Sequence, residues 1–246
     1  MKIGIIGSNG FIGRNLNFYF KDSKKINVKC FSSYKKNKSK WIKKISKEIK
    51  LFKPEIIINC AADQSSKDND KDIIGLINSN LMANALFLNQ ATKNKNFRGF
   101  ITFGTKWEYN ELKKFQPLNF YATTKHANDL FLKYYSLKKD IATVSLKIFE
   151  TYGKNDKRKR ILNLLLKNYK QQTTLKITPG NQFLDYIHIS ELCDLLKNIC
   201  EDIYKNKLKG FNTYTVSSKK PLKLRILIKK LNQALDKNIK VKIGAK

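Results

Sequence analysis

Tyr121 and Lys125 are the residues of this chain whose types and spacing point most directly to chemistry. They lie four positions apart in the segment Tyr121-Ala-Thr-Thr-Lys125, which opens a predicted helix. Residues at i and i+4 lie on one helix face, so the phenol and the ammonium can reach a common site. A free tyrosine, with a pKa of about 10, is a poor acid or base at neutral pH, and a neighbouring cation favours its phenolate form. The pair therefore predicts proton transfer by Tyr121, against the alternative that two common residue types share this spacing by chance.

Three glycines near the start of the chain form the second informative pattern. Gly7, Gly10 and Gly13 follow the apolar run Ile3–Ile6, and a helix-like stretch, Phe11–Lys21, overlaps their end. At a strand-to-helix turn, the first glycine allows a tight bend and the second lets a diphosphate approach the backbone. The third lets the helix pack closely on the strand, with its first N–H groups facing the phosphates. Glycine-rich turns also cap ordinary strands, but the strand before and the helix after favour a dinucleotide site.

Strand-like and helix-like segments alternate along the first 150 residues, and they predict the elements that position these residues. The strand segments are nearly continuous apolar runs, which is typical of a parallel sheet covered by helices on both faces. We therefore predict an α/β fold, a Rossmann doubly wound parallel sheet that binds a dinucleotide, over residues 1–150. The expected strands are Ile3–Ile6, Val28–Ser32, Glu55–Cys60, Phe97–Phe103 and Ala142–Ile148. The expected helices are Phe11–Lys21, Trp41–Lys50, Ile73–Lys93 and Tyr121–Leu137.

The pattern changes after Phe149, where shorter elements predict a smaller substrate-binding lobe over residues 151–246. Its segments are expected to interleave with the first domain, so a single boundary near residue 150 is a simplification. The expected helices are Ile161–Lys170, Cys193–Ile203 with Ser190 as its N-cap, and Leu224–Leu235. The expected strands are Tyr186–Ile189, Tyr214–Val216 and Ile239–Ile243.

The net charge of +31 raises nucleic-acid binding as an alternative function, because basic proteins gain affinity by releasing phosphate counterions. Only five of the 50 basic residues are arginine, the residue that bidentate recognition of phosphates and bases favours. The lysines are spread along the chain, and lysine, asparagine and isoleucine are abundant together, as an AT-rich coding sequence would produce. We therefore expect no nucleic-acid partner.

Apolar runs and cysteine usage bear on the compartment. The longest apolar runs, such as Ile56–Ile58, are far too short to cross a bilayer, and the turn at Gly7 leaves no room for a signal peptide. The four cysteines show no CxxC pairing, so we expect reduced thiols, no metal centre, no membrane association and a cytoplasmic location. They are Cys30, Cys60, Cys193 and Cys200.

The glycine turn and the Tyr121/Lys125 pair together resemble the extended short-chain dehydrogenase/reductase family, the NAD-dependent epimerases and dehydratases of nucleotide sugars. Asn59-Cys-Ala-Ala62 resembles the family's strand end beside the cofactor, and Asn80 lies where the next helix usually carries an asparagine. Leu146-Lys-Ile-Phe-Glu-Thr-Tyr-Gly153 resembles the family segment LRxFNxYG. Gly180-Asn-Gln-Phe-Leu-Asp-Tyr-Ile-His-Ile189 resembles the segment GxxxRDYIHV. The resemblance covers residues 1–235.

Within the family, the segment Phe103-Gly-Thr-Lys-Trp107 is most similar to the branch that makes dideoxyhexoses, such as abequose and paratose synthases. These are reductases or epimerases of nucleotide-linked 4-keto sugars, which implies a role in lipopolysaccharide O-antigen biosynthesis. The resemblance implies that Tyr121 exchanges a proton with the sugar and that Lys125 holds the nicotinamide ribose. A simple alignment places Phe103 at the family's active-site Ser/Thr, so we choose Thr105, two residues on, as the catalytic hydroxyl, with Thr102 as second choice.

The same resemblance implies a set of cofactor-binding residues. They are Gly7, Asn9, Gly10, Phe11, Ile12, Gly13, Ser32, Ser33, Lys35, Cys60, Ala61, Ala62, Asn80, Tyr121, Lys125, Ile148 and Phe149. NAD-preferring folds place an acid at the end of the second strand, where it binds the ribose 2′-hydroxyl. Residues 31–36 contain hydroxyl and ammonium groups and no acid, so the sequence favours NADP over NAD. The alternative is that Lys35 simply belongs to a solvated basic loop.

The substrate end departs from the family pattern. Leu184 replaces the arginine that grips the sugar-nucleotide diphosphate, and Glu150 replaces the asparagine of LRxFN. A leucine lacks the bidentate donors of a guanidinium, and a carboxylate repels a diphosphate. Lys154, Arg158 and Arg160 of the following loop are candidates to compensate, against the alternative that such a basic run is a solvated surface. The expected substrate-binding residues are Thr105, Lys106, Glu150, Arg158, Arg160 and Asp185.

The sequence thus predicts an NAD(P)-dependent oxidoreductase that most simply reduces the 4-keto group of a nucleotide-activated sugar. An epimerase with tightly bound NAD is the related alternative. A 4,6-dehydratase is disfavoured, because Gly104-Thr105 occupies the position of the Asp-Glu pair such enzymes carry. A catalytically degenerate NADP-binding sensor or scaffold is the alternative from another class. The resemblance also implies a homodimer formed through the helices at Leu81–Lys93 and Tyr121–Leu137.

Overall fold

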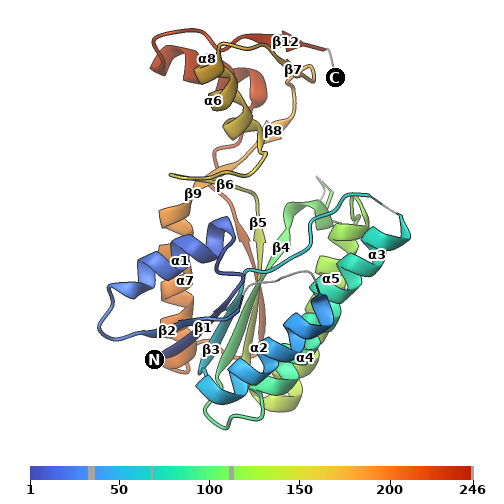
Figure 1. Cartoon of the computed structure of the whole chain (residues 1–246), viewed down its shortest axis with the longest axis vertical. Coiled ribbons are helices and arrows are strands. Elements are labelled where there is room, and N and C mark those ends of the chain that lie inside the picture. Colours follow the sequence, from blue (N-terminus) through green and yellow to red (C-terminus); the bar gives the residue numbers. More distant parts are fainter. Residues whose placement is uncertain (33–36, 68, 111–113, 245–246) are drawn as a thin grey trace. The chain divides into compact units, whose positions relative to one another are not determined.

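The computed structural model describes residues 1–32, 37–67, 69–110 and 114–244, which form two compact units. Unit 1 contains Met1–Ile148 and Ile189–Val216. Unit 2 contains Phe149–His188 and the residues from Ser217 onward. The chain therefore leaves unit 1 after its fifth strand and returns to it for one helix and one strand before entering unit 2 again (Figure 1).

Unit 1 is built on a six-stranded parallel sheet with the strand order β10-β5-β4-β3-β1-β2. Its strands are β1 (Lys2–Ile6), β2 (Asn27–Cys30), β3 (Ile56–Asn59), β4 (Gly99–Thr105), β5 (Ala142–Ile148) and β10 (Phe211–Val216). Every residue of β3 and β4 is buried, which explains why these strands are continuous runs in which apolar residues predominate. The strand order reverses between β1 and β3, and ligands of open α/β sheets bind outside the carboxyl ends at such a point.

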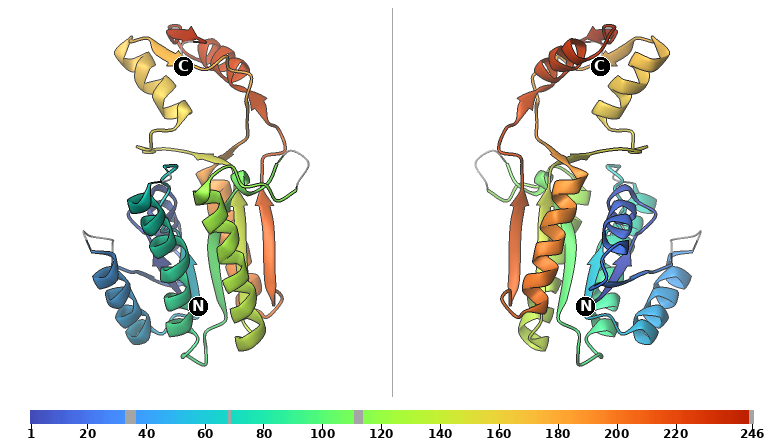
Figure 2. Two further views of the ribbon diagram at one scale, coloured as in Figure 1. Left: turned by 90° about the vertical axis from the view of Figure 1, so that its right-hand side faces the viewer. Right: turned by 90° about the vertical axis from the view of Figure 1, so that its left-hand side faces the viewer.

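Helices cover both faces of this sheet (Figures 1 and 2). One face carries α1 (Phe11–Lys21) and α7 (Ile189–Tyr204). The other carries α2 (Lys38–Phe52), α3 (Asp70–Leu76), α4 (Ala83–Ala91) and α5 (Phe120–Lys139), with a π-helical turn, η1 (Ile77–Met82), joining α3 to α4. The predicted Rossmann doubly wound α/β fold is confirmed. Within the described part of the chain, no helix combines the length and apolar character needed to cross a membrane.

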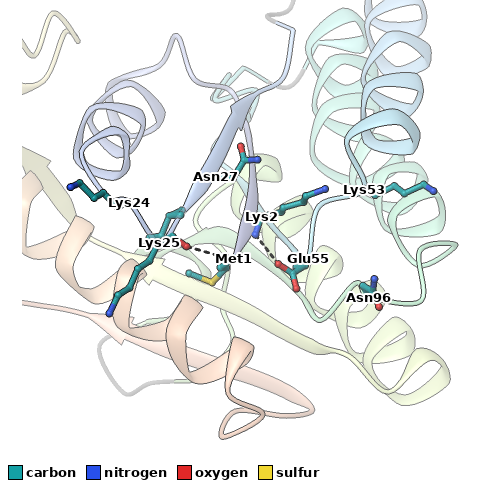
Figure 3. A pocket seen from close by; sticks show the side chains of 9 residues that line it. Met1, Lys2, Lys24, Lys25, Asn27, Lys53, Glu55 and Asn96 are labelled. Atoms are coloured by element: carbon teal, nitrogen blue, oxygen red, sulfur yellow. Dashed lines mark hydrogen bonds between the residues drawn. The ribbon is translucent and has the colours of Figure 1, made fainter.

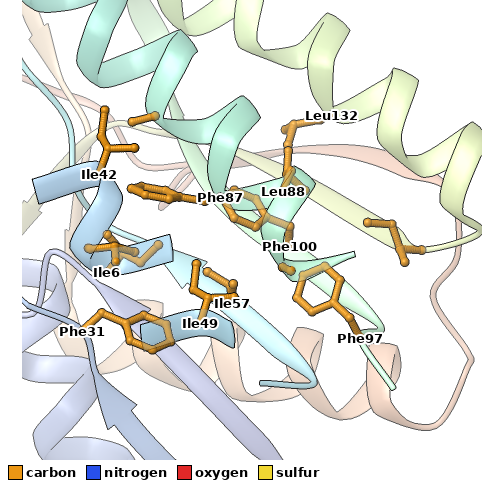
Figure 4. Close-up of a cluster of buried hydrophobic side chains, with 14 of the residues drawn as sticks. Ile6, Phe31, Ile42, Ile49, Ile57, Phe87, Leu88, Phe97, Phe100 and Leu132 are labelled. Atoms are coloured by element: carbon orange, nitrogen blue, oxygen red, sulfur yellow. The ribbon is translucent and has the colours of Figure 1, made fainter. Parts of the chain in front are cut away.

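A large apolar cluster joins α2 and α4 to the sheet (Figure 4). Ile6, Ile57 and Phe100 supply the sheet side of this cluster, and each has zero exposed surface. Phe87 of α4 packs edge-on against Trp41 of α2, with ring centroids 5.6 Å apart. Burial of one such aromatic side chain contributes roughly 1.5–3 kcal/mol. This packing holds the helices that carry the polar groups described below against the sheet.

Unit 2 has a smaller core of its own and three short strand pairs. The pairs are β6 (Glu150–Tyr152) with β9 (Tyr186–His188), β8 (Phe183–Leu184) with β11 (Leu222–Lys223), and β7 (Leu175–Ile177) with β12 (Val241–Ile243). Two helices, α6 (Ile161–Gln171) and α8 (Leu224–Ala234), pack on them. The buried core residues are Leu165, Ile177, Leu184, Leu224, Ile228 and Ile239.

The five strands expected in the first 150 residues are confirmed to within two residues at each end, and two other expectations need correction. The single helix expected over Ile73–Lys93 is interrupted by η1, because a π-helical turn inserts one extra residue per turn. Ser190 is not an N-cap, since α7 starts directly after β9 and Ser190 lies inside its first turn. With no loop residue between strand and helix, there is no place for a separate cap.

Candidate active site

The glycine turn connects β1 to α1 with little free space. Gly7 has a φ of +78°, a conformation that favours glycine, and a Cβ there would lie 2.6 Å from the amide nitrogen of Ala61. A Cβ on Gly13 would lie 2.4 Å from the carbonyl oxygen of Gly7. The amide of Gly10 donates to the same carbonyl at 3.0 Å. The structure thus gives a steric reason for glycine at the first and third positions, as the motif predicts.

The first turn of α1 has an uncapped N-terminus and no acidic residue. Gly10 is the N-cap and has no side chain with which to cap the helix, and Asn9 and Gly10 are exposed. The first turn contains no acid, so the positive end of the helix dipole is not neutralised there. Phe11 is buried and anchors the turn, and Ile12 is half-buried.

The loop after β3 lies beside the glycine turn, because β3 is the neighbour of β1 in the sheet. The half-buried residues Cys60, Ala61 and Ala62 open this loop. The amide of Cys60 donates to the carbonyl of Ile6 at 2.9 Å, and the amide of Ala61 donates to Oδ1 of Asn59 at 3.0 Å. These bonds place the predicted cofactor-binding residues of β1 and β3 along one edge of the sheet.

Asn80 fixes the far end of the same loop. Its Oδ1 accepts from the amide of Asp63 at 3.1 Å, and its Nδ2 donates to the Asp63 carbonyl at 3.2 Å and to Oγ1 of Thr124 at 3.1 Å. Asn80 is 1% exposed and lies in η1, so the π-helical turn aims its amide at the loop. The structure places this predicted cofactor-binding residue as a clamp between the loop and α5.

A ladder of buried amides, which sequence reasoning missed, continues from Asn80. Nδ2 of Asn59 donates to Oδ1 of Asn84, and Nδ2 of Asn84 donates to Oδ1 of Asn128 at 2.9 Å and to the carbonyl of Asn80 at 2.8 Å. Each of these side chains is at most 2% exposed. Buried polar groups are satisfied in this way when they specify one arrangement, and here they tie the end of β3 to α4 and α5.

Tyr121 and Lys125 lie on one face of α5, as their spacing predicts. The helix is capped by Asn119, whose side-chain oxygen accepts from the amide of Ala122 at 2.9 Å. Tyr121 is 8% and Lys125 is 4% exposed, and the Lys125 Nζ lies 5.9 Å from the centroid of the Tyr121 ring. The indole of Trp107 packs edge-on against this ring at 6.3 Å. The phenol and the ammonium are therefore brought together beside the residues that follow β4.

Burial lowers the pKa of Lys125 from 10.5 to about 8, because desolvation disfavours the ammonium form. The carboxylate of Glu108 opposes this shift and favours the charged form, whereas the neighbouring ammonium of Lys147 adds to it. Lys125 thus loses its proton at a lower pH than a free lysine, and three of the charged residues that act on its pKa, Glu108, Lys147 and Asp129, form a buried ionic cluster.

Thr105 is the last residue of β4 and is 8% exposed. Its Oγ1 accepts from the amide of Trp107 at 3.3 Å, and its own amide donates to Oε1 of Glu108 at 2.8 Å, so the two residues form a capping box. This box opens a short 3₁₀ turn, η2 (Lys106–Glu108), with Lys106 half-buried at its start. Ile148, at the end of the neighbouring strand β5, pairs in register with Thr105. Thr102, the second choice, lies in the middle of β4 at 2% exposure.

Glu108 belongs to a buried ionic cluster with Lys147 and Asp129. The Nζ of Lys147 lies 2.5 Å from Oε2 of Glu108 and 2.7 Å from Oδ2 of Asp129. A Cβ on Gly104 would lie 2.4 Å from the Lys147 side chain and 2.6 Å from Oε1 of Glu108, so glycine leaves room for the cluster. Sequence reasoning missed all three charged residues. The Thr105-xx-Glu108 spacing, a capping-box signature, was the available signal.

The carboxylates of Glu108 and Asp129 and the imidazole of His126 lie close enough together to hold a metal ion, with one ligand atom from each within 4.8 Å of the others. Lys147 already places a cation against both carboxylates. The His126 ring stacks on Phe115 at 4.0 Å, and its Nδ1 lies 3.4 Å from Glu108. The chain therefore neutralises these acids with its own ammonium.

Ser32 follows β2 and is held by an acid from helix α2. Its amide donates to Oε2 of Glu48 at 2.8 Å, its hydroxyl donates to Oε1 of the same residue, and its carbonyl accepts from Nε1 of Trp41 at 2.8 Å. Glu48 is a residue that sequence reasoning missed, because it lies 16 positions further along the chain. Ser33 and Lys35, also predicted to bind the cofactor, lie outside the described residues.

The remaining predicted residues lie in unit 2. The amide of Glu150 donates to the carbonyl of Asp185 at 3.0 Å, where β6 pairs with β9. The Asp185 carboxylate is 4% exposed and accepts from the hydroxyl of Ser217 and from the amide of Ser218 at 2.8 Å. Phe149, the first residue of the unit, is half-buried. Asp185 thus joins two separate segments of unit 2.

Arg158, one of the three basic residues expected to compensate for the missing diphosphate-binding arginine, is engaged inside unit 2. Its guanidinium donates to both carboxylate oxygens of Asp156 at 2.8 Å and to the carbonyl of Thr151 at 2.6 Å. Arg160 occupies the N-cap position of α6 and is half-buried. Leu184 is 8% exposed within the unit's apolar core, which fits the expectation that it makes no polar contact.

A basic pocket of about 490 Å³ lies at the other end of the unit 1 sheet (Figure 3). Inside it, the amide of Lys2 donates to Oε2 of Glu55 at 2.8 Å. Its lining residues surround the amino ends of β1, β2 and β3, whereas Gly7, Ala61 and Thr105 lie at carboxyl ends. The lining residues are Met1, Lys2, Lys24, Lys25, Ile26, Asn27, Lys53, Glu55 and Asn96. Since α/β sheets bind ligands at carboxyl ends, this pocket is separate from the candidate active site.

A doubly wound sheet with a glycine turn and a Tyr-Lys pair at its carboxyl edge defines a dinucleotide-binding class of protein. Residues 3–212 match the model of the NAD dependent epimerase/dehydratase family. This match covers most of the chain, and the chain belongs to that family of enzymes. The predicted family is confirmed.

A curated relative and two solved structures are similar to this chain. CDP-abequose synthase of Yersinia pseudotuberculosis is 28% identical over 144 residues, or 58% of this chain, and the match spans 50% of that relative's length. UDP-glucuronic acid 4-epimerase from Bacillus cereus, in complex with UDP-glucuronic acid and NAD, has a TM-score of 0.83 at 19% identity, covering 99% of this chain and 86% of the other. RMD from Pseudomonas aeruginosa, complexed with NADPH, has a TM-score of 0.81 at 15% identity, covering 100% and 88%. At these identities the two structures support the fold.

Proposed function

We propose that this protein is an NAD(P)-dependent oxidoreductase that reduces the 4-keto group of a nucleotide-activated deoxysugar. The observation that carries the proposal is the placement of the Tyr121 ring between Lys125 and Trp107, which lies two residues after Thr105. The glycine turn lies at the carboxyl edge of the same sheet. The similarity to CDP-abequose synthase supports a nucleotide-linked sugar as substrate and O-antigen sugar biosynthesis as the setting. The matched region spans half of that relative's length, so the substrate class is part of the proposal.

In this proposal Thr105, Tyr121 and Lys125 act together on the sugar carbonyl. Thr105 accepts or donates a hydrogen bond at the sugar oxygen and orients the carbonyl, and Tyr121 gives its phenolic proton to that oxygen as the carbonyl is reduced. The ammonium of Lys125 stabilises the phenolate that remains. The bound nicotinamide supplies hydride chemistry. Holding both reactants in one geometry supplies much of the rate enhancement.

The residues at the carboxyl edge fit a dinucleotide. Gly7 and Gly13 leave no room for side chains, and the acid-free first turn of α1 from Gly10 to Ile12 suits a diphosphate. In the proposal, Ala61 and Ala62 line the cofactor, Asn80 holds their loop, and Lys125 binds the nicotinamide ribose. Ser32 lies where the adenine ribose is expected. The sequence favours NADP because no acid follows β2 before α2. In the structure, however, Glu48 of α2 accepts hydrogen bonds from Ser32 at this position.

The experiment that tests the proposal is Tyr121→Phe. We expect the loss of the hydroxyl to lower turnover of a 4-keto nucleotide sugar at least 10²-fold, on the order of general acid catalysis, with nearly unchanged cofactor affinity. A panel of CDP-, UDP-, GDP- and dTDP-linked 4-keto sugars identifies the substrate, and Tyr204→Phe, at a 40% exposed tyrosine of α7, is the matched control. Full activity of the Tyr121→Phe variant rules out the mechanism.

Two other functions make different predictions. A nucleotide-sugar 4-epimerase would retain NAD through purification and interconvert two sugars with no added cofactor, and the fold shared with UDP-glucuronic acid 4-epimerase supports this candidate. A degenerate NADP-binding sensor would bind the cofactor and no sugar nucleotide. The engaged Arg158 and the buried Leu184 support the sensor, whereas the Tyr121/Lys125 pair opposes it. Thermal-shift measurements with cofactors and sugar nucleotides separate the three.

The proposal includes a cytoplasmic homodimer. Large apolar side chains are exposed on one face of α5 and on the adjoining α3–α4 segment, and α5 packs on that segment. On that face of α5 they are Leu130, Tyr134 and Leu137, which we call the α5 stripe; their i, i+4, i+7 spacing places them on one helix face, and Phe131 is exposed next to it. On the adjoining segment they are Ile74, Ile77, Met82 and Leu86. Contiguous exposed apolar surface of this kind favours association, and a second copy of the chain offers a matching surface.

A further inference from the structure

The end of β2 is the position where Rossmann folds distinguish NAD from NADP. An acid there accepts a hydrogen bond from the ribose 2′-hydroxyl of NAD, and basic or small polar groups accommodate the 2′-phosphate of NADP. The sequence after β2 contains no acid before helix α2. The structure nevertheless brings a carboxylate to this position, because α2 packs its Glu48 against Ser32.

Glu48 is held firmly by its place on α2. Trp41, Ile45 and Ile49 belong to the buried stripe of this helix, and Glu48 lies in the same i, i+4, i+7, i+8 series. Ile45 has no exposed surface and Ile49 is 2% exposed, so the turn that carries Glu48 is anchored in the apolar cluster. The Nε1 of Trp41 also donates to the carbonyl of Ser32 at 2.8 Å, a second connection between α2 and the end of β2. The carboxylate of Glu48 is therefore fixed at Ser32 and remains half-buried.

The hydrogen bonds of Ser32 decide what this position can bind. Its amide and its hydroxyl are the donors that a 2′-phosphate would need, and both donate to Glu48. A 2′-phosphate is a dianion with no proton to donate, so it would meet a carboxylate and compete with it for both donors. A ribose 2′-hydroxyl carries a proton and can donate it to the same carboxylate. The pair thus favours a ribose diol and repels a phosphate.

We propose that Glu48, acting with Ser32, is the residue that sets the cofactor preference of this protein, and that it selects NAD over NADP. The inference rests on the proposed function in one respect, namely that a nicotinamide dinucleotide binds along the carboxyl ends of β1 and β2. It reverses the preference expected from the sequence, because the acid missing from the end of the strand is supplied by the following helix.

Direct binding of NADH and NADPH tests the proposal without any need for activity. Dissociation constants are measured by calorimetry for the wild type, for Glu48→Gln and for the control Glu201→Gln, whose side chain is 40% exposed on α7. We expect the wild type and the control to bind NADH about tenfold more tightly than NADPH, equal to about 1.4 kcal/mol. In Glu48→Gln this ratio should fall about tenfold, chiefly through tighter binding of NADPH.

A second variant guards against a purely structural effect of Glu48. Combining Glu48→Gln with Ser32→Asp returns a carboxylate to the end of β2, and we expect this double variant to recover the preference for NADH. A wild type that prefers NADPH, or a Glu48→Gln variant with an unchanged ratio, overturns the proposal while the proposed function stands. A folded wild type that binds neither dinucleotide overturns the proposed function and this inference with it.

Discussion

The ammonium nitrogen of Lys147 lies 2.5 Å from Oε2 of Glu108, and both side chains are at most 3% exposed. The other oxygen of Glu108 accepts from the backbone amide of Thr105 at 2.8 Å, so one buried acid joins the ammonium to the backbone of the residue that carries the proposed catalytic hydroxyl. Glu108 also raises, and Lys147 lowers, the pKa of Lys125. The ionic cluster therefore holds the backbone of Thr105 in place and modifies the pKa of Lys125, which burial lowers.

Lys147→Met should destabilise the protein by about 3–5 kcal/mol, because it leaves the buried carboxylates of Glu108 and Asp129 without their cation. For a chain of this size, that loss lowers the melting temperature by roughly 6–20 °C. Thermal unfolding followed by circular dichroism measures this change in melting temperature.

The matched control for this prediction is Lys133→Met, which removes a lysine from the exposed face of α5. A surface change of this kind is expected to alter stability by less than about 0.5 kcal/mol. If Lys147→Met melts at the same temperature as Lys133→Met, the cluster contributes no net stability.

Local patterns were sufficient to predict most of the unit 1 sheet. The strand at Ala142–Ile148 and the helix at Phe11–Lys21 have the bounds that their apolar periodicity predicts. The helix expected over Ile73–Lys93 was interrupted for a reason that lies elsewhere in the chain. Its π-helical turn places Asn80 against the loop after β3 and against Thr124 of α5, and no local pattern records these contacts.

The candidate site divides in the same way. Tyr121 and Lys125 were predictable because i, i+4 spacing on a helix is a local relationship. Glu108 and Lys147 meet across 39 positions, and Glu48 reaches Ser32 across 16, so their pairing depends on how helices and strands pack. The sequence shows which residues carry charge, but it does not show which residue each charge contacts in the fold.

Gly13→Ala and Gly10→Ala should separate the steric role of the glycine turn from its proposed binding role. A Cβ on Gly13 meets the carbonyl of Gly7 at 2.4 Å, so Gly13→Ala should lower the melting temperature and abolish cofactor binding. A Cβ on Gly10 lies 3.3 Å from the same atom, so Gly10→Ala should remain folded but bind the cofactor at least tenfold more weakly. Thermal unfolding and calorimetry with NADH measure both quantities. If Gly10→Ala binds the cofactor normally, the cofactor diphosphate does not bind at this turn.

The dimer proposed through the α5 stripe predicts that charge on this face produces a monomer. Leu130 and Leu137 are 68% and 76% exposed, and the double change Leu130→Glu with Leu137→Glu places like charges opposite one another across a two-fold interface. Size-exclusion chromatography with light scattering should give a dimer for the wild type and a monomer for the variant. The control variant Phe18→Glu changes a residue of α1 that is 76% exposed, and it should remain a dimer. A monomeric wild type contradicts the proposal.

Cofactor affinity should fall as the pH rises through about 8, because burial lowers the pKa of Lys125 to that value and the proposed contact to the ribose needs the ammonium form. The sign follows from linkage: bound cofactor favours the charged lysine, so binding takes up a proton above pH 8 and the dissociation constant rises up to tenfold per pH unit. In the free protein the same shift acts in the opposite direction, since the unfolded chain holds this proton up to pH 10.5 and the lysine's contribution to stability therefore rises between pH 8 and 10.5. Calorimetry with NADH from pH 6.5 to 9.5 tests the first effect, with Lys125→Met as a variant of similar length that does not titrate. We expect Lys125→Met to bind more weakly at pH 7 and to show a flatter profile, and identical profiles for the two proteins would place the titrating group elsewhere.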